Sequence, residues 1–121
     1  MAQYHAHLRI HLIFSTKDRR RSIAPAFESK LHSYLGGIAR QNDTRMMAVN
    51  GVADHVHMLL GLSPQTVIST LVRLLKCNSS RWARRSHDRR FAWQSGYAAF
   101  SVSRSMEQKT LAYIRKQKEH H

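Results

Sequence analysis

The stretch that decides the fold is Arg45 to Leu62, RMMAVNGVADHVHMLLGL. Two apolar segments flank a short connection that contains glycine, a pattern typical of a β-hairpin. In an extended strand successive side chains alternate between faces, so His55 and His57 project to one side and Val56 to the other. The hairpin therefore predicts a preformed pair of imidazole ligands on one face of a sheet.

Hydrophobic periodicity predicts the other elements around this hairpin. Apolar residues alternate in strands and recur every three or four positions in helices. Pro25 suits a first helical position, and Ser63-Pro64 and the capping-box pair Ser105 and Gln108 indicate two later helix starts. The expected elements are strand 5–16, helix 25–40, strand 45–52, strand 54–62, helix 64–84, strand 97–103 and helix 105–121.

This order of elements predicts the α+β fold class. A split βαβ (ferredoxin-like) arrangement satisfies it, with two βαβ units sharing one antiparallel sheet and with the helices on one face. A chain of 121 residues is expected to form a single domain over residues 1–121. Its last helix, about 105–121, would place Tyr113 and Gln117 four positions apart on one face.

The composition describes a folded polycation. Lys and Arg total 20 against 7 Asp and Glu, a formal net charge of +13, while 42% of residues are hydrophobic. Such an excess favours a nucleic-acid partner, although ribosomal or membrane-surface association leaves a similar pattern. The single Cys77 excludes an intrachain disulfide and a cysteine-based zinc cluster. No apolar run is long enough for a membrane span, so a cytoplasmic location is expected.

Basic residues cluster in the second predicted helix and the loop after it, and a basic turn follows the first strand. Their density favours phosphate binding, with a solvated helix face as the alternative. Trp82 lies within this cluster, and exposed aromatic rings can stack on unpaired bases. Trp93 and Tyr97 follow this cluster in the sequence. Stacking on bases and burial in the hydrophobic core are equally good interpretations of these two residues. The residues predicted to contact nucleic acid are Lys17, Arg19, Arg73, Lys76, Arg81, Trp82, Arg84 and Arg85.

Two histidines, one glutamine and one tyrosine suit metal-assisted attack on a phosphodiester. Imidazole ligands favour Mn, Fe, Ni or Zn over Mg. In a chain with nine histidines, the His-x-His pair alone is weak evidence for a metal site and can be incidental. Tyr113 can be an ordinary surface residue of an amphipathic helix, and Gln117 an ordinary solvated helix former. The residues taken singly leave both interpretations open.

Five segments together are more specific, and they resemble the HUH single-tyrosine transposases. This family includes small insertion-sequence transposases that act on single-stranded DNA and REP-associated tyrosine transposases. The segments are HLIFSTK at 11–17, DHVHML at 54–59, KCNSSRW at 76–82, WQSGYAAFSVS at 93–103, and Tyr113-Ile114 through Gln117 to His120-His121. Cys77 and Lys116 depart from the Gly and Asn that are common in the family.

The resemblance implies an RRM-like antiparallel sheet and a transposase activity. His55, His57 and Gln117 would be metal ligands for Mg²⁺ or Mn²⁺, and Tyr113 would be the nucleophile that forms a 5′-phosphotyrosine with single-stranded DNA. Family members recognise DNA hairpins as homodimers, and in some the tyrosine helix completes the partner's site. Two alternatives remain open: a non-catalytic, domesticated protein that binds hairpins or single strands, and a metal-dependent nuclease in which water attacks.

Overall fold

The structure is a computed structural model that describes residues 7–117. Residues 5–6 of the expected first strand and residues 118–121 of the expected last helix, with His120-His121, lie outside the described residues. The observed elements confirm the expected order. They are β1 (Arg9–Ser15), η1 (Lys17–Arg19), α1 (Pro25–Gln41), β2 (Arg45–Val52), β3 (His55–Gly61), α2 (Ile68–Ser86), β4 (Ala98–Ser101), η2 (Arg104–Met106) and α3 (Glu107–Arg115).

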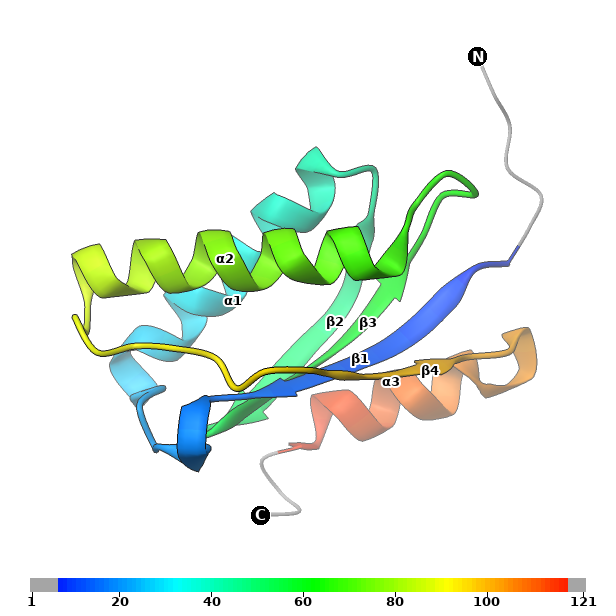
Figure 1. The fold of residues 1–121 in the computed structure, drawn as a ribbon. Helices are drawn as coiled ribbons and strands as arrows, with labels where there is room; N and C mark the ends of the chain where they lie inside the picture. Colours follow the sequence, from blue (N-terminus) through cyan, green and yellow to red (C-terminus); the bar gives the residue numbers. More distant parts are fainter. Residues whose placement is uncertain (1–6, 118–121) are drawn as a thin grey trace.

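The four strands form one antiparallel sheet in the order β2-β3-β1-β4 (Figure 1). β2 and β3 make the predicted hairpin, with Val52 paired to His55 beside the turn. On one face, alternate residues of β1 and β3 pack against α1 and α2 in the larger core; these are Ile10, Leu12, Phe14, Val56, Met58 and Leu60. The predicted fold class, an α+β antiparallel sheet with helices, is confirmed.

One detail of that expectation is wrong, because α3 does not share a face with α1 and α2. It lies on the opposite face of the sheet and packs chiefly against β2 and β3 (Figure 1). Leu111 and Ile114 of α3 join Leu59 of β3 in a second, smaller core. Every residue of β3 is buried, since apolar side chains occur on both of its faces. Leu59 follows His57 on the same face, and its burial requires a helix there.

The last helix is also shorter than the 105–121 predicted. α3 begins at Glu107 after the η2 turn, and the capping box of Ser105 and Gln108 does not form. Lys116, with φ −100° and ψ 13°, ends the helix. The side chain of Asn50 donates a hydrogen bond to the carbonyl of Arg115 at 3.1 Å, an acceptor that a longer helix would pair with a later backbone N–H.

α2 begins at Ile68, four residues after the predicted start at Pro64. Ser63 and Thr66 instead close a turn: the amide of Thr66 donates to the carbonyl of Ser63 at 3.1 Å, and their hydroxyls are 3.0 Å apart. The extended backbone of Val67 then precedes the helix. Within residues 7–117, no helix has both the length and the apolar character that crossing a bilayer requires.

Gly51 of β2 offers a stability test of the hairpin. A Cβ at this position would overlap the carbonyl oxygen of His55 and lie 3.1 Å from the Cα of Val56. We expect Gly51→Ala to destabilise the fold by about 1–3 kcal/mol, as overpacking does. Gly37→Ala is the matched control: apart from the adjacent residues and the backbone of the helix itself, no atom lies within 4 Å of a Cβ at this position inside α1, so alanine should stabilise by about 0.5–1 kcal/mol. Urea unfolding measures both, and equal effects would contradict the steric argument.

Candidate active site

The two histidines of the hairpin lie on the face of the sheet that α3 covers. His55 and His57 alternate along β3 with Val56, which points into the larger core on the other face. Each histidine is only 7% exposed, and their ring centroids are 5.0 Å apart. The prediction that both rings project to one face is confirmed.

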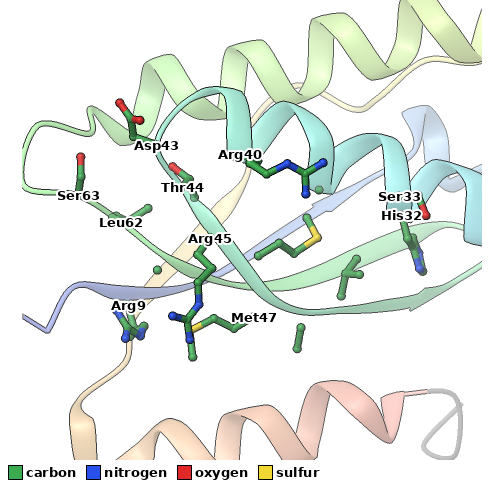
Figure 2. Close-up of a pocket in the computed structure, with 15 residues that line it drawn as sticks. Arg9, His32, Ser33, Arg40, Asp43, Thr44, Arg45, Met47, Leu62 and Ser63 are labelled. Atoms are coloured by element: carbon green, nitrogen blue, oxygen red, sulfur yellow. The ribbon is translucent and has the colours of Figure 1, made fainter.

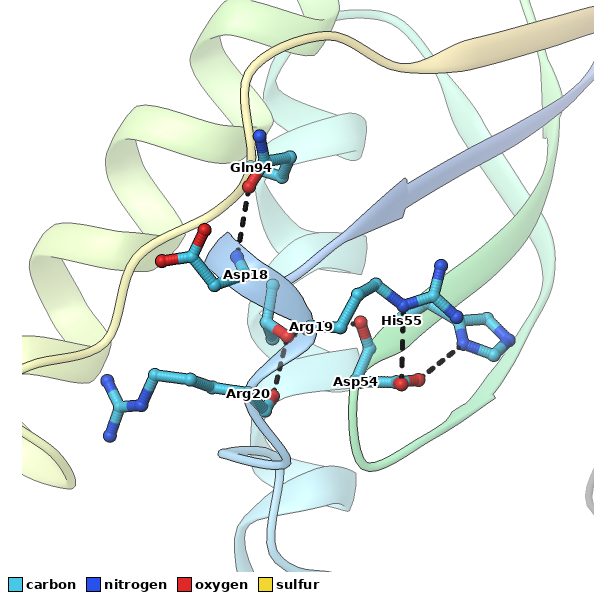
Figure 3. Close-up of polar contacts among 7 residues, drawn as sticks. Asp18, Arg19, Arg20, Asp54, His55 and Gln94 are labelled. Carbon is cyan, nitrogen blue, oxygen red and sulfur yellow. Dashed lines mark hydrogen bonds and ion pairs between the residues drawn. The ribbon is translucent and has the colours of Figure 1, made fainter.

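Asp54, at the start of β3, orients the first histidine. Its Oδ1 lies 2.7 Å from Nδ1 of His55, and its Oδ2 accepts a hydrogen bond from Nε of Arg19 at 3.3 Å (Figure 3). Burial by itself would raise the pKa of Asp54, but hydrogen bonds from His55 and Arg19 and the charge of Arg19 outweigh it and lower the pKa. The carboxylate is therefore ionised at neutral pH, and it favours the His55 tautomer with hydrogen on Nδ1.

His11 of β1 orients the second histidine in the same way. Its Nε2 lies 2.9 Å from Nδ1 of His57. Burial lowers the pKa of His11, so its ring is neutral at pH 7 and Nε2 can accept a hydrogen bond. If His57 donates through Nδ1, both histidines of the pair present Nε2 as the nitrogen for a ligand.

α3 brings Tyr113 to this cluster from the opposite end of the chain. The Tyr113 ring centroid lies 6.0 Å from that of His57 and 6.1 Å from that of His11, and the tyrosine is 45% exposed. Gln117 follows the end of the helix and is 1% exposed. Asn50, which pairs with His57 across the β2–β3 hairpin, holds the end of α3 through the carbonyl of Arg115.

His11, Asp54 and Asn50 were not among the residues predicted to form the site. A signal existed for each of them. His11 falls on the face of β1 that is opposite the apolar stripe, Asp54 directly precedes the histidine pair, and Asn50 is a polar residue in a strand of otherwise mostly apolar side chains. What the sequence did not supply is the strand register that brings His11 and Asn50 beside His57.

The residues predicted to contact nucleic acid lie mainly on α2 and the η1 turn. Six of them are exposed: Lys17, Arg19, Arg73, Arg81, Arg84 and Arg85. Lys76 is half-buried, and its Nζ donates to the carbonyls of Gln94 at 2.6 Å and Gly96 at 2.9 Å. Burial lowers its pKa. Its contacts secure the segment before β4, and a role in binding DNA stays a prediction.

The aromatic residues near the basic cluster divide between core and surface. Trp82 packs in a stack with Tyr34 and Phe27, at ring-centroid distances of 4.5 Å and 5.4 Å. Trp93 is half-buried, and its ring lies edge-on to Phe14 at 4.7 Å. Tyr97 is exposed. The core position is thus confirmed for Trp93 and not for Tyr97, whereas base stacking by Trp82 stays a prediction.

A pocket of about 1070 Å³ lies elsewhere, between α1 and β2 (Figure 2). Its lining includes Arg9, Arg40, Arg45 and Met47 but neither histidine of the pair nor Tyr113. The histidine-tyrosine cluster is therefore not part of this pocket. Tyr113 is accessible from the surface, whereas His55 and His57 are nearly buried beside it.

Asp54→Asn tests the electrostatic contribution of this carboxylate. Its folded-state pKa is lowered, so the charged form stabilises the fold above the ordinary aspartate pKa, and this stabilisation is lost as the pH falls through the folded-state pKa. We expect Asp54→Asn to be less stable than the native chain at pH 7 and equally stable in strong acid, in urea unfolding with a chelator present. Asp43→Asn, at an exposed turn, is the control. A difference that is independent of pH would contradict this account.

Comparison with known proteins decides the family. The family model described as "Transposase IS200 like" matches residues 4–117. The chain belongs to this family. The resemblance to HUH single-tyrosine transposases is thereby confirmed.

Two curated transposases are similar to this chain. It is 35% identical over 74 residues to the ISDra2 transposase TnpA of Deinococcus radiodurans, covering 61% of this chain and 53% of the relative. It is 30% identical over 70 residues to the transposase for insertion sequence element IS200 of Salmonella typhimurium, covering 58% and 46%. The aligned segments thus span about half the length of these relatives.

Two solved structures share the fold. A candidate transposase from Deinococcus radiodurans R1 superposes with a TM-score of 0.79 at 30% identity, over 97% of this chain and 95% of that one. A REP-associated tyrosine transposase bound to a REP hairpin superposes with a TM-score of 0.74 at 15% identity, over 100% and 74%. At this low identity, the second match supports the fold alone.

Proposed function

We propose that this IS200-like transposase cleaves single-stranded DNA beside a hairpin and rejoins it to another strand through a covalent bond to Tyr113. The observation that carries the proposal is the position of Tyr113. An exposed phenol lies with its ring centroid 6.0 Å from that of His57, in a family whose members are transposases.

The reaction consists of two transesterifications. The hydroxyl oxygen of Tyr113 attacks the scissile phosphorus, and the bond from phosphorus to the 3′ oxygen breaks. The phenol proton leaves, the departing 3′ oxygen takes up a proton, and a 5′-phosphotyrosine remains. A 3′-hydroxyl from another strand then attacks the same phosphorus and releases Tyr113. One phosphodiester replaces another at each step, so no nucleotide cofactor is needed.

The donor set fits a divalent metal ion. His55 and His57 would offer Nε2, since the Nδ1 of each lies within hydrogen-bond distance of Asp54 or His11. Within residues 7–117, no cluster of three or more His, Cys, Asp or Glu side chains forms a metal site. Gln117 is buried, at 1% exposed, and its amide oxygen would be the third protein ligand. Held by these residues, Mg²⁺ or Mn²⁺ would supply Lewis-acid polarisation of a phosphoryl oxygen.

The surrounding residues hold these groups in place. Asp54 and His11 fix the ring orientation of His55 and His57, a role that partners of metal-binding histidines commonly have. Asn50 and the buried Leu111 and Ile114 hold α3 on the sheet. This keeps Tyr113 close to the histidines of its own chain.

The DNA partner is supported by charge. The whole chain has a formal net charge of +13, and the exposed basic residues of α2 and the η1 turn would attract phosphates. This predicts binding that weakens steeply with salt. One similar structure holds a REP hairpin, and we extend hairpin recognition to this chain. We also propose that it acts as a homodimer.

The proposed function is tested by cleavage of hairpin-containing single-stranded DNA from the flanks of the gene. The DNA is labelled at the 5′ or the 3′ end and incubated with Mn²⁺, with Mg²⁺ or with a chelator before denaturing electrophoresis. We expect a slow-migrating protein–DNA species that retains the 3′ label and a shorter 5′-labelled product, both only with metal. Hairpin binding without cleavage across the whole flank would overturn the proposal and favour a non-catalytic binder.

A further inference from the structure

Phe100 is a large apolar side chain that the fold leaves exposed beside the candidate site. It lies on β4, an edge strand, and is 56% exposed. It pairs with His11 across the β1–β4 ladder, and directly paired residues of neighbouring strands point to the same face. Phe100 therefore lies on the face that holds His57 and Tyr113.

Its neighbours place Phe100 near the reacting groups. The ring centroid of His11 is 6.3 Å from that of Phe100, 5.1 Å from that of His57 and 6.1 Å from that of Tyr113. α3 packs chiefly against β2 and β3, so it leaves the surface of β4 largely uncovered. Three of the four residues of β4 are exposed. The sheet thus presents an aromatic surface next to the proposed nucleophile.

We propose that Phe100 is a stacking platform for one unpaired base adjacent to the scissile phosphate, an inference that rests on the proposed function. Every base has an apolar π-face, and aromatic side chains on antiparallel sheets commonly stack with unpaired bases. The net charge of +13 draws the phosphate backbone to this protein, while Phe100 offers the base an uncharged surface. The base that it holds fixes which phosphate lies at Tyr113.

This role makes Phe100 a specificity-determining residue and not a structural one. Because the side chain is exposed, its removal should not create a cavity in either core. We expect Phe100→Ala to lower kcat/KM for cleavage by roughly 10- to 100-fold, the loss typical of one aromatic–base stack. Phe100→Trp should keep most of the activity, because it keeps an aromatic face. Phe100→Leu should lose activity as Ala does, although it keeps apolar bulk.

The test combines these variants with DNA in which one base at a time, on either side of the mapped cleavage site, is removed to leave an abasic sugar. At the contacted position, removing the base should lower kcat/KM of the native chain roughly as much as Phe100→Ala does with intact DNA. For the Phe100→Ala variant, removing the same base should lower kcat/KM little further, because the stack is already lost. Val67→Ala, which removes an exposed apolar side chain before α2, is the control and should cleave every DNA as the native chain does.

Four outcomes would overturn the inference. If the losses from Phe100→Ala and from the missing base add at every position, or if Phe100→Ala keeps full activity, Phe100 does not stack on a base. Either result would leave the proposed function intact. A shift of Phe100→Ala from dimer to monomer in sedimentation without DNA would show that a second copy of the chain covers β4. A native chain that binds hairpins and cuts none would instead remove the proposed function, and this inference with it.

Discussion

His57→Ala is expected to lower the rate of metal-dependent DNA cleavage by roughly 10³-fold or more. The change removes one of two imidazoles that would hold the metal. Metal ions typically supply several kcal/mol of transition-state stabilisation, and each loss of about 1.4 kcal/mol lowers the rate tenfold. It also removes the group that lies 2.9 Å from Nε2 of His11. Single-turnover cleavage of end-labelled hairpin DNA over a range of Mn²⁺ concentrations measures the loss.

The control for this prediction is His32→Ala, because His32 lies on α1, on the other side of the sheet from α3. It should cleave DNA as the native chain does. His57→Ala should still bind hairpins, since the exposed arginines of α2 are unchanged. Unaltered metal-dependent cleavage by His57→Ala would mean that the metal is held elsewhere.

Tyr113→Phe is expected to abolish the covalent protein–DNA species and to lower cleavage by on the order of 10⁴-fold or more, as loss of a catalytic nucleophile does. The substitution removes one oxygen and keeps the ring beside His57 and His11, so the fold and the DNA affinity should not change. Tyr34→Phe, on α1 in the opposite layer, makes the same chemical change and should leave cleavage intact. Denaturing electrophoresis of both variants with 3′-labelled DNA measures the effect.

The outcome for Tyr113→Phe also separates the alternative mechanisms. Cleavage that persists in the Phe variant and still needs metal would identify water as the nucleophile and the chain as a nuclease. Cleavage that is lost only together with hairpin binding would indicate that the phenol contributes to binding the DNA.

Much of the fold follows from alternation and spacing in the sequence. The apolar stripe of β1 and the His-x-His alternation of β3 predict which face each side chain occupies, because strand geometry has a strict period of two. The helix ends were predicted less well. Ser63-Pro64 and the capping-box pair Ser105 and Gln108 are local signals, and the surrounding contacts override them: a Ser63–Thr66 turn delays α2, and η2 precedes α3.

The side of the sheet that α3 occupies required tertiary information. Leu59 is an apolar residue on the histidine face, and only a helix packed there can bury it. The packing of α3 on this face also brings Tyr113 to His57, although no local sequence pattern connects α3 with β3. The contacts of His11 and Asn50 with the histidine strand depend on strand register, which pairs β1 with β3 and β2 with β3 at fixed residues. Local sequence identifies the candidate groups, and packing decides which of them meet.

The central claim is that Tyr113 becomes covalently attached to DNA, and mass spectrometry of the trapped species tests it most directly. The adduct formed with Mn²⁺ is isolated under denaturing conditions, trimmed with nuclease and digested with trypsin. The tryptic peptide Thr110–Arg115 holds one tyrosine. We predict that this peptide carries the mass of a 5′-phosphorylated nucleotide on Tyr113. A nucleotide on any other residue, or cut DNA with no modified peptide, would contradict the account.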